Sequence, residues 1–238
     1  MRYRVEVATV EQFTESIEVS QLDYIYTPVN VAKSIVPLLA GGGRSSAVIQ
    51  KSKHRIIVLP SVFTCESLQE MYDMGFTRAL ANTIGHIQIF QNVGLSIHGG
   101  LRLNITNSVA MEQYEKLGLV DSILSIELSL QRMKSLKSVI PRGFIAYGKF
   151  PMMLLRRFPK VSGLTDRKDK FLPLIHGNGE AELLNPVSLI LSDRMGEFSD
   201  MDFAVFKLMP GESVQEVLAL YKKGVKPKED FTRGLYYK

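Results

Sequence analysis

The stretch that decides the fold reads His98-Gly-Gly-Leu-Arg-Leu-Asn-Ile-Thr-Asn-Ser108 and, after an amphipathic segment, Ser122-Ile-Leu-Ser-Ile-Glu-Leu-Ser129. Both apolar runs turn polar toward their C-terminal ends. Val109 to Gly118 lies between them, has helical spacing and ends in a glycine. Two strands joined by one such helix usually pair in parallel. We therefore expect a strand–helix–strand unit whose polar residues line a ligand crevice.

The same alternation extends over the whole chain of 238 residues. Strand-like segments lie near residues 5, 23, 56, 79, 97, 123, 145 and 204, mostly separated by helical patterns. This rhythm predicts an α/β fold, a (β/α)8 TIM-type barrel, with residues 1–238 as a single domain. Short apolar pieces and turn residues near 164–191 predict a β-hairpin insertion. An open doubly wound sheet is the alternative, but the glycine-rich dinucleotide fingerprint is missing.

Composition narrows the class of protein. Hydrophobic residues make up 45% and charged residues 22%, which is typical of a globular domain. The net charge of +5 permits RNA or an acidic ligand as a partner. No apolar run is long enough to cross a membrane, and the N-terminus lacks a signal-peptide core. We therefore expect a cytoplasmic location and no membrane partner.

Glu127 is the candidate catalytic residue, because it follows an apolar strand. Partial burial there would raise its pKa toward the range useful for an acid or base. Asn104 and Asn107 can each donate and accept hydrogen bonds, which suits ligand orientation as well as it suits helix capping. His86, His98 and Glu127 fall near strand ends and offer a two-His-one-carboxylate metal site. We favour unrelated pocket or surface roles for these histidines and leave a metal open.

The single Cys65 excludes an internal disulfide and any multi-cysteine metal site in this chain. It lies in the first turn of a helix expected over Thr64 to Met74. A helix N-terminus lowers the pKa of a thiol, but no histidine partner is identifiable by spacing. We expect Cys65 to be a small packing residue.

Several motifs, in order along the chain, resemble those of the peptidase U32 family, also called collagenase-like proteases. They are Leu103-Asn-Ile-Thr-Asn-Ser108, Ser125-Ile-Glu-Leu-Ser129, Tyr147-Gly-Lys-Phe-Pro-Met-Met153, Leu164-Thr-Asp-Arg-Lys168, Leu184-Asn-Pro186 and Thr232-Arg-Gly234. The resemblance runs from about Ile56 to the C-terminus and implies a barrel fold. It also implies a peptidase of unassigned mechanism that acts on a peptide or an anionic small molecule at the barrel mouth.

We expect further residues in that pocket beside Glu127. The ligand would be bound by Asn104, Asn107, Tyr147, Arg167, His98 and Arg233. The two arginines would hold an anionic group, since a guanidinium binds carboxylates and phosphates in a bidentate way.

Some members of the family take part in RNA or quinone hydroxylation and carry an iron–sulfur cluster on four cysteines. The family's Cys-Pro after the Tyr-Gly motif is Phe158-Pro159 here, and a later cysteine position carries Ile175-His176. Phe158 cannot ligate iron, so we expect no such cluster and no cofactor in this chain. Two alternatives to a peptidase stay open: an RNA- or quinone-modification factor, and a non-catalytic subunit that partners a cluster-bearing homologue.

Overall fold

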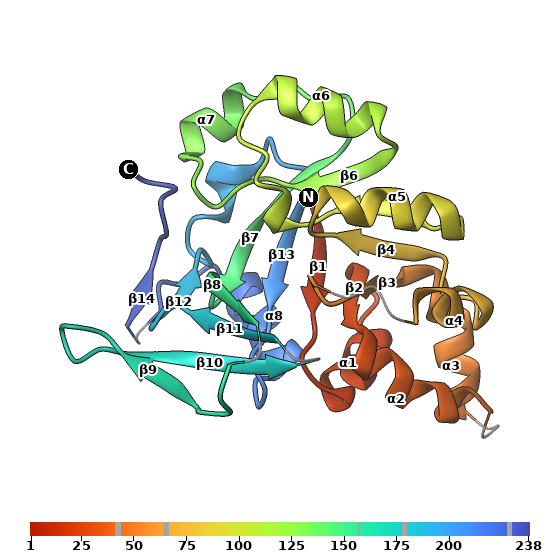
Figure 1. Ribbon diagram of the computed structural model, residues 1–238. Coiled ribbons are helices and arrows are strands. Elements are labelled where there is room, and N and C mark those ends of the chain that lie inside the picture. The colour runs from red at the N-terminus through yellow and green to blue at the C-terminus, as the bar shows by residue number, and fades with distance from the viewer. Residues whose placement is uncertain (41–43, 64–66, 157, 178–179, 228–229) are drawn as a thin grey trace.

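The computed structural model describes residues 1–40, 44–63, 67–156, 158–177, 180–227 and 230–238. Eight parallel strands form a closed barrel (Figure 1). In their order around the barrel they are β13 (Phe203–Lys207), β1 (Arg2–Glu6), β2 (Leu22–Pro28), β3 (Ile56–Leu59), β4 (Arg78–Ala81), β5 (Ser96–Gly99), β6 (Leu119–Ile123) and β7 (Arg142–Gly148). The ring closes where β13 pairs with β7, with Ala204 beside Phe144. The eight expected strands and the TIM-type barrel are confirmed.

Helices surround the barrel and connect its strands (Figure 1). They are α1 (Val10–Glu18), α2 (Val29–Ala40), α3 (Arg44–Ser52), α4 (Leu68–Asp73), α5 (Ile84–Val93), α6 (Ser108–Lys116), α7 (Leu130–Ser135) and α8 (Val214–Lys223), with 3₁₀ turns η1 (Lys53–Arg55), η2 (Leu101–Leu103) and η3 (Met195–Phe198). None of the described helices is long and apolar enough to cross a bilayer. The expected role of Cys65 at a helix start lies outside the described residues.

Local sequence explains where the helices begin. Thr9, Thr83 and Ser213 each cap a helix by accepting a backbone N–H with the side-chain hydroxyl. Asn107 is the N-cap of α6, and its side chain accepts a hydrogen bond from the N–H of Ala110.

A separate four-stranded antiparallel sheet interrupts the barrel between β7 and β13. Its strands run in the order β8 (Pro151–Arg156), β11 (Glu180–Leu184), β10 (Phe171–Gly177) and β9 (Gly163–Thr165). The expected hairpin is present as β10 and β11, but the inserted sheet starts earlier, at Pro151. Two further short strands, β12 (Ser188–Ile190) and β14 (Phe231–Thr232), extend the barrel sheet: β12 lies beside β7, and β14 lies beside β12.

The inserted sheet lies at the C-terminal end of the barrel strands (Figure 1). It has its own small apolar cluster around Leu174, Ala181 and Leu183, distinct from the main core of the barrel. The inserted sheet is therefore a unit that packs against the barrel mouth without sharing the barrel's core.

Candidate functional site

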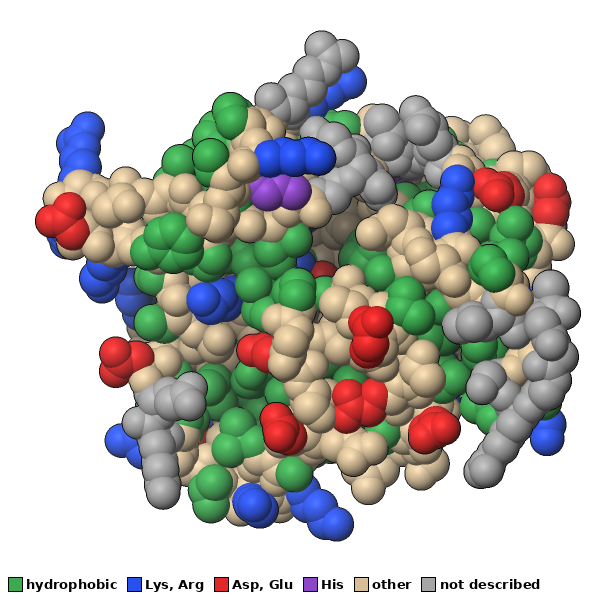
Figure 2. Space-filling model, turned by 90° about the horizontal axis from the view of Figure 1, so that it is seen from below, with side chains coloured by type: hydrophobic (Ala, Val, Ile, Leu, Met, Phe, Trp, Pro, Cys, Tyr) green, Lys and Arg blue, Asp and Glu red, His purple; other side chains and the backbone are tan. Residues whose placement is uncertain are grey.

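A cavity of about 290 Å³ opens at the C-terminal ends of the barrel strands. Barrel residues such as Leu80, Ile123 and Ile145 supply apolar wall, while the inserted sheet contributes His176 and Glu182. Figure 2 looks onto this end of the molecule, where the surface is hollowed beside Lys or Arg and His side chains. The volume is suited to a small ligand, and such clefts at the C-terminal face of a barrel are where ligands usually bind.

Four charged side chains alternate along one wall of this cavity. Lys207 Nζ lies 2.6 Å from Glu6 Oε1 and 3.2 Å from Glu182 Oε2. Arg102 Nη2 lies 2.7 Å from the other oxygen, Glu182 Oε1. We call Glu6, Lys207, Glu182 and Arg102 the charge chain.

The strand register explains half of the charge chain. Glu6 and Lys207 are opposite each other as the last residues of the neighbouring parallel strands β1 and β13. Their side chains therefore reach the cavity side by side. Arg102 comes from η2 after β5, and Glu182 comes from β11 of the inserted sheet. The chain joins three separate parts of the fold.

Electrostatic interactions within the charge chain keep Glu182 and Lys207 charged at neutral pH. Burial alone would raise the pKa of Glu182, but Lys207 and Arg102 outweigh it and lower that pKa to about 2. Burial opposes the charge of Lys207, yet Glu182 and Glu6 raise the pKa of its ammonium above the ordinary value. Glu182 and Lys207 are therefore both charged at neutral pH, and the cavity offers a carboxylate and a cation to a ligand.

A second carboxylate of the inserted sheet also contacts the barrel. Glu180 Oε1 accepts hydrogen bonds from the Ser61 hydroxyl and, at 2.7 Å, from the backbone N–H of Phe63. Both Ser61 and Glu180 line the cavity. Glu180 and Glu182 thus attach one strand, β11, to two sides of the barrel mouth.

His86 is a buried positioning residue and not a metal ligand. Its Nδ1 accepts from the N–H of Asn82 at 3.3 Å, and its Nε2 lies 3.4 Å from the carbonyl of Val62. Burial lowers the pKa of His86, so the ring stays neutral and donates through Nε2. With both nitrogens engaged, His86 holds the backbone at Asn82, whose side chain lines the cavity.

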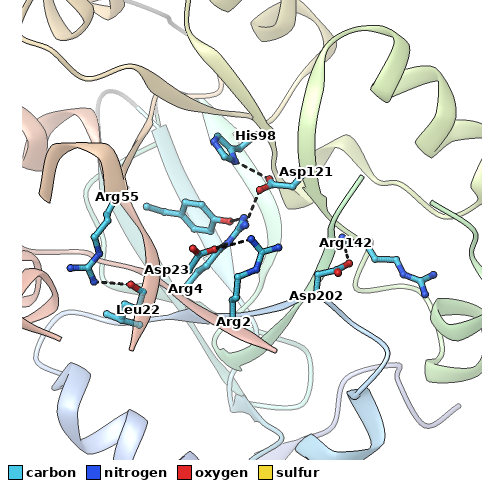
Figure 3. A network of polar contacts seen from close by, with 10 residues as sticks. Arg2, Arg4, Leu22, Asp23, Arg55, His98, Asp121, Arg142 and Asp202 are labelled. Carbon is cyan, nitrogen blue, oxygen red and sulfur yellow. Dashed lines mark hydrogen bonds and ion pairs between the residues drawn. The ribbon is translucent and has the colours of Figure 1, made fainter. Parts of the chain in front are cut away.

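A largely buried polar network, which also includes the partly exposed Asp23, fills another part of the barrel interior (Figure 3). Arg4 donates to Asp121 Oδ2 at 2.8 Å and to the hydroxyl of Tyr26 at 3.0 Å. His98 Nδ1 lies 2.9 Å from Asp121 Oδ1, while its Nε2 has no partner among the described residues. His98 is only 1% exposed and does not line the cavity. The network is part of the barrel's core.

Glu127 lies outside the cavity. It is in an exposed turn after β6, so the partial burial expected for it is wrong. Its backbone N–H donates to the Ser125 hydroxyl at 3.2 Å, and that hydroxyl donates to Asn104 Oδ1 at 2.5 Å. Asn104 is exposed with a left-handed backbone, φ 51°. These residues build a turn, and the acid–base role of Glu127 stays a prediction.

The other expected binding residues are also elsewhere. The Tyr147 hydroxyl donates to Glu212 at 2.9 Å, and Arg233 pairs with Asp193 at 2.7 Å. Arg167 is exposed in the inserted sheet, and Asn107 caps α6. Since none of them lines the cavity, the structure does not bring the expected ligand-binding residues together.

The alternative of a histidine–carboxylate metal site is not supported, because His86, His98 and Glu127 do not come together in the described part of the chain. His86 holds backbone, His98 pairs with Asp121, and Glu127 lies in an exposed turn. Within the described ranges, no group of three or more His, Cys, Asp or Glu side chains is arranged to hold a metal ion.

Part of the charge chain has a recognisable signal in the sequence. Glu6 and Lys207 are single charged residues at the C-terminal ends of apolar strands, which is the position where barrel sites are built. Arg102 lies within the quoted stretch, between two leucines. Glu182 carried no signal, because its place depends on how the inserted sheet folds over the mouth.

No family model matches the sequence, and no curated protein matches it either. Several solved structures are similar in shape, including a peptidase and an aldolase. The U32 peptidase Mk0906 has a TM-score of 0.48 at 9% identity, with 90% of this chain and 94% of that chain covered. The YdjI aldolase from Escherichia coli K12 has a TM-score of 0.42 at 11% identity, with 60% of this chain and 66% of that chain covered. The barrel assigned above is based on strand pairing and does not depend on these likenesses.

Proposed function

We propose that this chain is a U32-type enzyme whose cavity at the barrel mouth binds a small peptide or peptide-like ligand. The observation that carries the proposal is the charge chain, because Glu6 and Glu182 offer carboxylates while Lys207 and Arg102 offer cations in one cavity. A peptide fragment carries a free amino group and a carboxylate, and each has a counter-charge there. The U32-like motifs, which follow one another in the family's order along the sequence, suggest the reaction, which is hydrolysis of an amide bond.

The apolar wall supports the same class of ligand. Leu80, Ile123 and Ile145 lie in the cavity with the charge chain. A small side chain can pack against them while the charged ends of the ligand are paired, as in most small-molecule sites. A long nucleic acid would instead need an extended basic groove with stacking aromatics.

The test is a binding and cleavage assay with the purified chain and a panel of di- and tripeptides. Calorimetry measures affinity, and mass spectrometry detects products that have gained one water. We expect peptide binding to weaken at least ~tenfold in Lys207→Met and in Glu6→Gln, the loss of one charge-assisted contact. Peptides that bind neither the wild type nor the variants would overturn the proposal.

The net charge of +5 keeps RNA modification as a second candidate. Protein purified without nuclease would then carry RNA, visible as a high ratio of absorbance at 260 nm to that at 280 nm. Copurification with a cysteine-rich homologue would instead favour the non-catalytic subunit. Either outcome, combined with failure to bind peptides, would replace the proposal.

A further inference from the structure

We propose that Arg102 and Lys207 form a subsite for the carboxylate of a ligand, and that Glu182 of the inserted sheet occupies this subsite until the ligand displaces it. The inference builds on the function proposed above and names the group that the cavity recognises. It also makes the inserted sheet a gate that the ligand itself opens.

The geometry around Glu182 is that of a bound carboxylate. Each of its oxygens meets one cation, with Arg102 Nη2 at 2.7 Å from Oε1 and Lys207 Nζ at 3.2 Å from Oε2. Both cations come from the barrel, whereas the carboxylate comes from the inserted strand β11. For a carboxylate ligand that enters the cavity, Arg102 and Lys207 are therefore already in position, but both are paired with Glu182.

The inserted sheet does not share the apolar core of the barrel, so its displacement from the mouth need not break that core. Its apolar cluster around Leu174 and Leu183 is separate from the core of the barrel. In the part of the chain that the structure describes, β11 contacts the barrel through the carboxylates of Glu182 and Glu180. Both line the cavity, so water and ligand can compete with these contacts.

Charge favours a carboxylate over a phosphate. Lys207 keeps its contact to Glu6 Oε1 at 2.6 Å when Glu182 leaves. The vacated subsite then carries one net positive charge, from two cations and the one remaining carboxylate. A carboxylate balances it, while a phosphate dianion would bring a second negative charge close to Glu6.

The experiment measures acetate and inorganic phosphate binding by titration calorimetry and by NMR. We expect acetate to bind Glu182→Ala at least ~tenfold more tightly than the wild type, because the internal competitor is gone. The double variant Arg102→Met, Glu182→Ala should lose that gain. Glu182→Gln keeps the size of the side chain without its charge, and serves if the alanine variant does not fold.

Glu180→Gln is the matched control, since it weakens the other contact of the same strand. We expect it to tighten acetate binding less than ~twofold, because it does not vacate the cations. Equal tightening in both variants would mean that the sheet merely loosens, and would overturn the subsite. Unchanged acetate affinity in Glu182→Ala and Glu182→Gln, or a preference for phosphate, would overturn it as well.

The two proposals can fail separately. Tighter acetate binding without any peptide binding would uphold the subsite and reject the peptide function. Peptide cleavage with acetate affinity unchanged by Glu182→Ala would do the reverse.

Discussion

Arg4 and Asp121 join two strands that are not neighbours in the barrel, with Arg4 Nη2 donating to Asp121 Oδ2 at 2.8 Å. Arg4 is fully buried and Asp121 is 4% exposed. The guanidinium also lies over the ring of Phe203, 3.5 Å from its centroid. A charged pair thus fills barrel interior that branched aliphatic side chains usually occupy.

We expect Asp121→Ala to lower the free energy of unfolding by about 3 kcal/mol, because the buried Arg4 would lose its closest carboxylate and keep only the partly exposed Asp23, at 3.3 Å. Asp121→Asn should cost less, since it keeps the shape and part of the hydrogen bonding. Urea denaturation followed by circular dichroism measures both. Arg194→Ala removes a half-exposed pair with Glu197 and is the control. A cost for Asp121→Ala as small as that of the control would contradict a buried pair.

The barrel was predictable because its signal is local and repeated. Each parallel strand is a short apolar run, and each helix between strands has its own periodicity, as from Val109 to Gly118. The start of the inserted sheet at Pro151 was missed, because Met152 to Leu155 is an apolar run without alternation. Both Met152 and Met153 are in fact exposed.

The site was much less predictable than the fold. Polar residues after β5 and β6 looked like a ligand crevice, but Asn104 and Ser125 bond to each other in a turn. The cavity wall instead brings together Glu6 and Glu182, whose positions are 176 residues apart along the chain. Such a pairing depends on how the inserted sheet packs on the mouth, and no periodicity reports that.

Gly148 ends β7 with φ +112°, where an added Cβ would overlap the carbonyl oxygen of Lys207. We expect Gly148→Ala to lower the free energy of unfolding by about 3 kcal/mol or more, because the left-handed backbone and the overlap with Lys207 both oppose a Cβ there. Because the overlap is with Lys207 itself, the variant should also weaken ligand binding in the cavity. Chemical denaturation and the peptide titration measure the two effects.

Gly211→Ala is the control for that prediction. Gly211 has φ +89°, and an added Cβ there has nothing within 4 Å. It should cost only about 1 kcal/mol, from backbone strain alone. If both glycine variants lower the free energy of unfolding by the same amount, the requirement for glycine at position 148 does not come from close packing against Lys207.

We expect Glu127→Gln to leave ligand binding in the cavity unchanged, because this carboxylate is exposed and does not line the cavity. Peptide titration against the wild type measures the affinity. The same variant tests its proposed acid–base role by turnover: full cleavage activity would remove Glu127 from the reaction. Weakened binding in Glu127→Gln would mean that the ligand extends beyond the cavity to the turn after β6.

Acid should weaken the fold through the charge chain. The pKa of Glu182 is lowered in the folded state to about 2, so its ion pairs stabilise the fold above the unfolded pKa of 4.5. That contribution is lost as the pH falls from about 4.5 to about 2, and it amounts to about 3 kcal/mol at most.

Glu182→Gln should therefore lose less stability than the wild type over this window, measured by urea denaturation at several pH values. Glu70→Gln, which removes an exposed pair with Lys33, should keep the wild-type pH dependence. Parallel curves for the wild type and Glu182→Gln would mean that Glu182 is not paired with Lys207 and Arg102 in solution.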